Sequence, residues 1–121
     1  MLKTTLNKEN AIVTLQPDGA LSKEDFTQSA EIIDAYLEQD NKLNGVIIYT
    51  KDFPGWDSFA SLISHLKFVK EHHKKVTHLA LVTDSIIGEF AEKIVRHFVD
   101  PKVKTFSFDQ LDKAQQWILE N

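Results

Sequence analysis

The sequence contains no cysteine, and this absence excludes several kinds of chemistry. The chain can form no disulfide framework, offers no thiolate nucleophile, and cannot build a four-thiolate or iron–sulfur site. Positive charge is also scarce, since 14 Lys and Arg face 18 Asp and Glu and the formal net charge is -4. A nucleic-acid binder needs a basic surface that displaces counterions from phosphate, so we expect no nucleic-acid partner.

Long apolar stretches are missing as well. The uninterrupted apolar runs are only a few residues long, whereas a membrane-spanning helix needs about 20 residues. The opening residues MLKTTLNKENAIV do not resemble a secretory signal peptide. No repeat and no linker rich in proline or serine divides the chain. We therefore expect one cytoplasmic domain over residues 1–121, in which a hydrophobic fraction of 42% supplies the core.

Short runs rich in β-branched residues and bounded by turn residues predict four strands. These runs are AIVTL (11–15), GVIIYT (45–50), LALVT (79–83) and VKTFSF (103–108). The opening LKTTL is a fifth candidate, because the polar turn NKEN can join it to residues 11–15 in an antiparallel hairpin.

Helical patterns alternate with these strands. Ser22 and Asp25 approach a capping box, which predicts a first helix over residues 22–39. Its apolar face is Phe26, Ala30, Ile33 and Leu37. Three more helices are expected after Asp57, after Asp84 or Ser85, and after Asp109. The last one carries Leu111, Ala114, Trp117 and Ile118. The order predicts an α/β fold with a mixed, mostly parallel sheet, an N-terminal antiparallel hairpin and about four helices.

This order, together with several local stretches, resembles the SpoIIAA-like family of the STAS and CRAL-TRIO type. The stretches are GALSKEDF, GVIIYTKDFPGWDSF, LKFVKEHHKKVTHLALVTD and DQLDKAQQWILEN, and they span nearly the whole chain. The resemblance implies a sandwich of helices around four or five strands. It also implies two different roles, one for each group of relatives.

One group of relatives, the anti-sigma-factor antagonists, switches a protein interaction by phosphorylating a serine at the start of the helix after the central strand. The resemblance places Ser58 at the matching point, so Ser58 is the implied phosphoacceptor. The other group, the Sec14-like carriers, holds a lipid between helices and sheet. That second analogy rests on architecture and implies an apolar pocket.

The segment KDFPGWDSF (51–59) concentrates aromatic residues in an expected loop. Ligands of open α/β sheets bind outside the carboxyl ends of the strands, where this loop must lie. Phe53 and Trp56 are then expected at the mouth of an apolar ligand pocket. The pocket continues with Phe59, Ile63, Ile86, Ile87 and Phe90. Two alternatives remain: Trp56 packs as a hydrophobic staple while Phe53 closes the core, or Trp56 anchors the protein at a membrane interface.

Phe68 lies on the otherwise polar face of the predicted second helix, about 180° from Phe59. A neighbouring helix, a ligand or another copy of the protein can cover it, and a homodimer contact is the preferred interpretation. The same helix ends in the basic stretch KFVKEHHKK (67–75). Such a stretch is attracted to an anionic membrane by about 1 kcal/mol for each nearby lysine.

Acidic and histidine residues suggest chemistry but have simpler explanations. Asp52, Asp57, Asp84 and Asp109 follow the strands, where a magnesium site is one alternative, but three of them are ordinary helix caps. The histidines are expected at the surface or beside helix dipoles. We predict no metal and no cofactor. The preferred function is a non-enzymatic module that binds an apolar or lipid-like ligand, with reversible membrane association; the alternative is a STAS-type interaction switch at Ser58.

Overall fold

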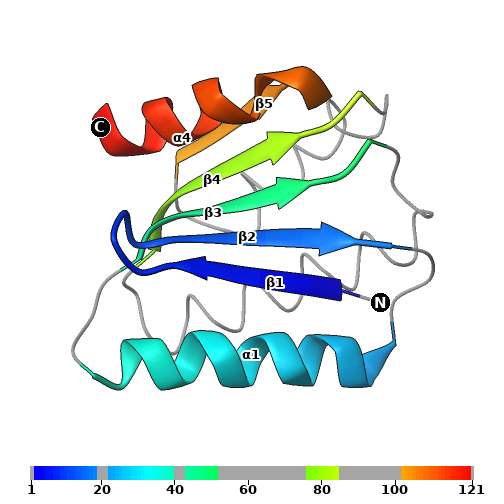
Figure 1. Cartoon of the computed structure of the whole chain (residues 1–121), viewed down its shortest axis with the longest axis vertical. Coiled ribbons are helices and arrows are strands. Elements are labelled where there is room, and N and C mark those ends of the chain that lie inside the picture. Colours follow the sequence, from blue (N-terminus) through cyan, green and yellow to red (C-terminus); the bar gives the residue numbers. More distant parts are fainter. Residues whose placement is uncertain (1, 19–21, 40–42, 52–75, 85–101, 121) are drawn as a thin grey trace.

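The computed structural model describes residues 2–18, 22–39, 43–51, 76–84 and 102–120. These residues form a five-stranded sheet in the order β1-β2-β3-β4-β5 (Figure 1). The strands are β1 (Leu2–Asn7), β2 (Ile12–Pro17), β3 (Leu43–Tyr49), β4 (Val76–Val82) and β5 (Lys102–Phe106). The pair β1 and β2 is antiparallel, and every other neighbouring pair is parallel.

The predicted strands and the antiparallel hairpin are confirmed, with shifted ends. The last strand was expected to reach residue 108, but β5 ends at Phe106 and a 3-10 turn, η1 (Phe108–Gln110), follows directly. The chain leaves the sheet there because the Ser107 amide donates to the Gln110 side-chain oxygen at 3.1 Å, as in a capping box. Asp109 lies inside this turn, with Ser107 as its N-cap, and the last helix begins two residues after Asp109, as predicted.

The helix α1 (Lys23–Leu37) begins where the sequence predicts. Ser22 accepts from the Asp25 amide at 3.2 Å, and the Asp25 carboxylate accepts from the Ser22 amide at 2.8 Å. Hydrogen bonding to the Ser22 backbone holds the pKa of Asp25 below its ordinary value of 3.8. Ile33 is buried on the predicted apolar face, and the side chains of Phe26, Ala30 and Leu37 lie outside the described set.

The helix α4 (Leu111–Glu120) packs its predicted apolar residues on the sheet. Ala114 and Ile118 are buried in a cluster with Ile12 and Ile47, and Leu111 and Trp117 pack against that cluster. Gly45 provides the space for this contact, since a Cβ there would lie 2.7 Å from the Ile118 side chain. The absence of a side chain at this position of β3 thus lets α4 approach the sheet closely.

The two described helices cover opposite faces of the sheet. α1 is linked to β1 by a hydrogen bond of 2.6 Å between the Thr4 and Ser29 hydroxyls. Thr4 pairs with Leu15. Side chains alternate between the two faces of a strand, and Leu15 is three residues from Ile12, which packs beneath α4. Leu15 and Thr4 therefore lie on the opposite face of the sheet. Figure 1 shows α1 beside the β1 edge of the sheet and α4 beside the β5 edge.

The expected second and third helices fall in residues 52–75 and 85–101, outside the described residues. Neither α1 nor α4, the helices of the described chain, has the length and apolar character needed to cross a bilayer.

Candidate functional site

The carboxyl ends of the parallel strands meet at one edge of the sheet, where α/β proteins bind ligands. β2, β3, β4 and β5 end there with Pro17, Tyr49, Val82 and Phe106. β1 runs in the opposite direction, so its first residues, including Lys3, lie at the same edge. This edge therefore combines side chains from both ends of the described sequence.

A short segment after β4 ties the neighbouring strand ends together. The Thr83 hydroxyl donates to the Lys51 carbonyl at 3.1 Å, and the Asp84 amide donates to the same carbonyl at 3.3 Å. On the other side, the Thr83 amide donates to the Phe106 carbonyl at 3.0 Å, and the Asp84 carboxylate accepts from the Phe108 amide at 2.9 Å. Thr83 and Asp84 thus fix the backbone positions of Lys51 and Phe108.

Two aromatic rings form a flat wall at this edge. The rings of Tyr49 and Phe108 are parallel, with an interplanar angle of 1° and centroids 4.6 Å apart. Strand register places one residue from each strand in a row across the same face: Lys3, Gln16, Tyr49, Val82 and Phe106. The row starts with an exposed lysine and ends with two buried apolar residues, so it changes from charged to apolar across the sheet.

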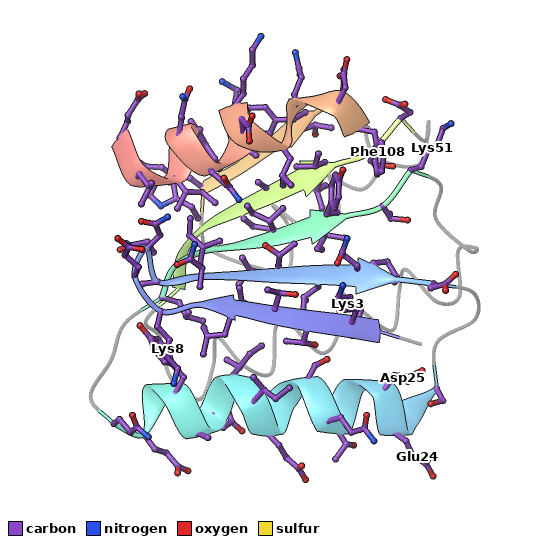
Figure 2. The ribbon with its side chains drawn as sticks, viewed as in Figure 1. Lys3, Lys8, Glu24, Asp25, Lys51 and Phe108 are labelled. Carbon is purple, nitrogen blue, oxygen red and sulfur yellow. The ribbon has the colours of Figure 1, made fainter. Side chains whose placement is uncertain are left out.

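A hollow of about 340 Å³ lies on the charged side of this row. It is lined by Lys3, Gln16, Pro17, Asp18, Tyr49, Thr50, Lys51 and Phe108. Figure 2 shows Lys51 and Phe108 close together beyond the ends of β3 and β4, and Lys3 on β1. Among the described residues, two lysines and one aspartate give the lining a formal charge of +1, opposite in sign to the net charge of the chain.

Comparison with known protein families agrees with this topology. The model of the SpoIIAA-like family matches residues 12–119. The chain belongs to the SpoIIAA-like family. No curated protein and no solved structure matches the chain significantly.

The ligand-pocket residues predicted for this SpoIIAA-like domain lie outside the described residues. They are Phe53, Trp56, Phe59, Ile63, Ile86, Ile87 and Phe90. The proposed phosphoacceptor Ser58 and the proposed interface residue Phe68 lie outside them too. All of these residues remain predictions.

The aspartates that suggested a magnesium site have a different arrangement where they are described. Asp84 accepts the hydrogen bond from the Phe108 amide, and Asp109 is exposed in η1. In the described part of the SpoIIAA-like domain, no group of three or more His, Asp or Glu side chains could hold a metal ion. Asp52 and Asp57 lie outside that part.

One histidine corrects the expectation that the histidines lie at the surface. His78 is only 3% exposed, and its ring meets the Trp117 ring edge-on with centroids 5.0 Å apart. The physical reason is that β4 begins earlier than predicted, at Val76, so that His78 shares a face with buried Ala80 beneath α4.

The residues that line the hollow were not among the predicted site residues, although the prediction concerned the same edge of the sheet. Tyr49 and Lys51 belong to the predicted strand end and the residue after it, but the analysis followed the chain further to the aromatic loop. Lys3 was missed because its place at this edge depends on the reversed direction of β1. The hairpin prediction contained that information, since an antiparallel strand starts where its partner ends.

Proposed function

We propose that this SpoIIAA-like domain is a non-enzymatic binding module for a small lipid-like ligand, with reversible membrane association. The observation that supports it is the hollow beside the parallel Tyr49 and Phe108 rings at the carboxyl edge of the sheet. Its volume of about 340 Å³ is at the lower end of the range for ligand pockets, which suits a head group or a short chain.

The hollow and the predicted aromatic mouth are continuous in sequence. Lys51 lines the hollow, and the segment with Phe53 and Trp56 follows it directly. In this proposal the apolar part of the ligand reaches from the Tyr49 and Phe108 wall toward those two aromatic residues. Its binding energy comes from burial of apolar surface, at about 25 cal/mol for each Å² removed from water.

The test has two arms. Mass spectrometry of a solvent extract of the purified protein is expected to reveal a lipid-like ligand. Titration calorimetry with dihexanoylglycerol, an uncharged probe, is expected to detect binding. Phe108→Leu should weaken that binding by about two- to tenfold, because it removes the parallel pair of rings and an aromatic pair contributes about 0.5–1.5 kcal/mol. Leu119→Ala, at an exposed position on α4, is the matched control and should bind as the original protein does. An empty extract together with no heat from the probe would refute the proposal.

A second candidate function is a STAS-type interaction switch, and membership in the SpoIIAA-like family favours it. Phosphorylation of Ser58 would add a charge of about -1.5 to -2 at the predicted start of a helix and so alter partner binding. Intact-mass measurement after co-expression with the cognate kinase tests it, with Ser58→Ala as control. A Ser58 that stays unmodified under those conditions argues against the switch.

The proposal of a homodimer contact at Phe68 stands beside both functions. Sedimentation velocity of the original protein and of Phe68→Ser tests it. A dimer that dissociates in the variant is the expected result, and a monomer at all concentrations contradicts the contact.

A further inference from the structure

We propose that the hollow at the carboxyl edge recognises a phosphate monoester, which Lys3 and Lys51 hold by its charge. This inference rests on the proposed binding function and assigns the head group of its ligand. It treats the two lysines as specificity-determining residues and the Tyr49 and Phe108 rings as the support for the rest of the molecule.

The first argument is the local charge. The chain as a whole carries a formal charge of -4, but the described part of the lining carries two ammonium groups and one carboxylate. A cavity with charge opposite to that of its protein attracts ligands that the remaining surface repels. An anion is therefore the ligand class that this lining favours.

The second argument is the placement of the two lysines. Lys3 belongs to β1, and Lys51 follows β3, with β2 between them (Figure 2). Neighbouring strands lie about 4.8 Å apart, so Lys3 and Tyr49 are about 10 Å apart across β2, and the Lys51 backbone, two residues beyond Tyr49, starts roughly 12 Å from Lys3. Each ammonium has three donors on a flexible four-carbon stem, so both groups can approach one anion placed between them.

The third argument selects phosphate over carboxylate. Lysine ammoniums act as point charges, whereas a planar carboxylate is best matched by the fork of an arginine, and the described residues of the lining include no arginine. A phosphate monoester has three terminal oxygens and a charge of about -1.5 to -2, so it can accept from several directions at once. The Gln16 amide and the Thr50 hydroxyl in the same lining are neutral groups of the kind that bind further phosphate oxygens.

The fourth argument is the order of side chains across the sheet. Lys3 and Gln16 precede Tyr49 in the row across the strands, and the Tyr49 ring stacks on Phe108. A ligand that follows this order has its charged group over β1 and β2 and its apolar body against the two rings. A phosphorylated amphipathic molecule fits this order better than inorganic phosphate does.

Titration calorimetry with two probes of identical tails tests the head group. Dihexanoyl phosphatidic acid carries a phosphate monoester, and dihexanoylglycerol carries none. The phosphorylated probe is expected to bind at least about tenfold more tightly at low salt, and added salt should reduce that advantage because the lysines are exposed. Equal binding of the two probes overturns the head-group assignment and leaves the proposed binding function intact. Binding of neither probe overturns both.

Charge variants give tests of opposite sign. Lys3→Gln and Lys51→Gln should each weaken binding of the phosphorylated probe about fivefold, as one lysine near an anionic group does. Asp18→Asn removes the carboxylate from the lining and should strengthen binding by a similar factor. Binding of the uncharged probe should change in none of these variants, which distinguishes loss of charge from loss of folding.

The control is Lys8→Gln. Lys8 is an exposed lysine in the turn between β1 and β2, at the opposite end of the sheet from Lys51 (Figure 2). Lys8→Gln changes the net charge of the protein by the same amount as Lys3→Gln does, and it should leave binding of both probes unchanged. If Lys8→Gln weakens binding of the phosphorylated probe as strongly as Lys3→Gln does, the attraction comes from the charge of the whole surface and the assigned site is wrong.

Flotation with vesicles identifies the source of the phosphate. Vesicles of pure phosphatidylcholine and vesicles doped with phosphatidic acid are compared in the presence of inorganic phosphate as competitor. Flotation only with the doped vesicles supports the proposal and assigns the head group to a bilayer lipid. If the protein floats with neither kind of vesicle but binds the soluble phosphorylated probe tightly, the result supports the proposal and identifies the ligand as a free phosphomonoester.

Discussion

One face of the sheet has two halves of opposite character. The half that lies beneath α4, here called the covered half, is mostly apolar; it contains Ile12, Gly45, Ile47, Ala80, Val82 and Phe106, together with the buried His78. The part of the same face on β1 and the carboxyl end of β2, the open half, is polar and includes Lys3, Thr5, Thr14 and Gln16. The two halves are joined, because neighbouring strands pair without interruption from β1 to β5. Tyr49 and Phe108 lie at the boundary between them.

The difference separates stability from binding. Residues of the covered half are constrained by close packing against α4, where even one added methyl group has no space. The open half lies away from β3, β4 and β5, the strands that α4 mainly contacts, so its residues can carry charge or hydrogen-bonding groups at little cost to folding. A site at the boundary gains a rigid aromatic wall from one half and adaptable polar groups from the other.

The largest expected effect comes from the centre of the covered half. Ile118→Ala removes a side chain that is only 2% exposed and leaves a cavity between α4 and β3, so the free energy of unfolding should fall by about 2–4 kcal/mol. Leu119→Ala changes the adjacent residue, which is 48% exposed, and should cost less than about 0.5 kcal/mol. Urea unfolding midpoints measure both. Similar losses in the two variants would show that α4 does not define a covered half.

The next effect tests the close approach of α4 to β3. Gly45→Ala places a methyl group within 2.7–3.0 Å of three Ile118 atoms and should cost about 1–3 kcal/mol through overpacking. The same change should cost less in an Ile118→Ala background, because the opposing atoms are gone. A double-mutant cycle by urea unfolding measures this coupling.

The matched control adds apolar volume to the open half. Thr5→Val, at an exposed position of β1, should alter the free energy of unfolding by less than about 0.5 kcal/mol. If Thr5→Val destabilises the protein as much as Gly45→Ala does, the open half is packed and the comparison fails.

A smaller effect is expected at the boundary. Asp84→Ala removes the acceptor of the Phe108 amide and should cost about 1 kcal/mol, with faster hydrogen exchange of that amide. Asp84→Asn keeps a side-chain oxygen as acceptor and should retain most of the stability and most of the protection. Urea unfolding and exchange measured by NMR follow both variants. Unchanged exchange in Asp84→Ala would mean that this contact does not hold Phe108 in place.

Much of the covered half could be predicted from the sequence, because burial leaves periodic patterns. The runs around Ile47 and Ala80 predicted central strands, and the spacing of Ala114 and Ile118 predicted the buried face of α4. The Ser22 capping box likewise marked the start of α1. These signals are local, so one sequence suffices to find them.

The predicted hairpin already implied the open half, because β1 and β2 are neighbours in sequence. The hollow beside it could not be predicted in the same way, because Tyr49, Lys51 and Phe108 join it only through the order of the strands. Lys3 and Lys51 are 48 positions apart, and no local pattern connects them. His78 was also misjudged, since its burial depends on Trp117, which belongs to an element far away in the sequence. Contacts between distant segments are set by topology, which local periodicity does not contain.

The smallest effect lies on α1, which covers the other face of the sheet, and its size depends on pH. The pKa of Asp25 is lowered in the folded protein by hydrogen bonding to Ser22, so its ionised form stabilises the folded state above the unfolded pKa of about 3.9. That contribution should be lost as pH falls through the still lower folded pKa. The stability gap between the original protein and Asp25→Asn should therefore be present at neutral pH and should narrow in acid. Glu24→Gln removes the same charge from the same helical turn but leaves the Ser22 contacts intact, so its gap should be smaller (Figure 2). Urea midpoints measured across the acid range decide between a specific cap and a general charge effect, because Asp25, and not Glu24, is the capping-box partner of Ser22.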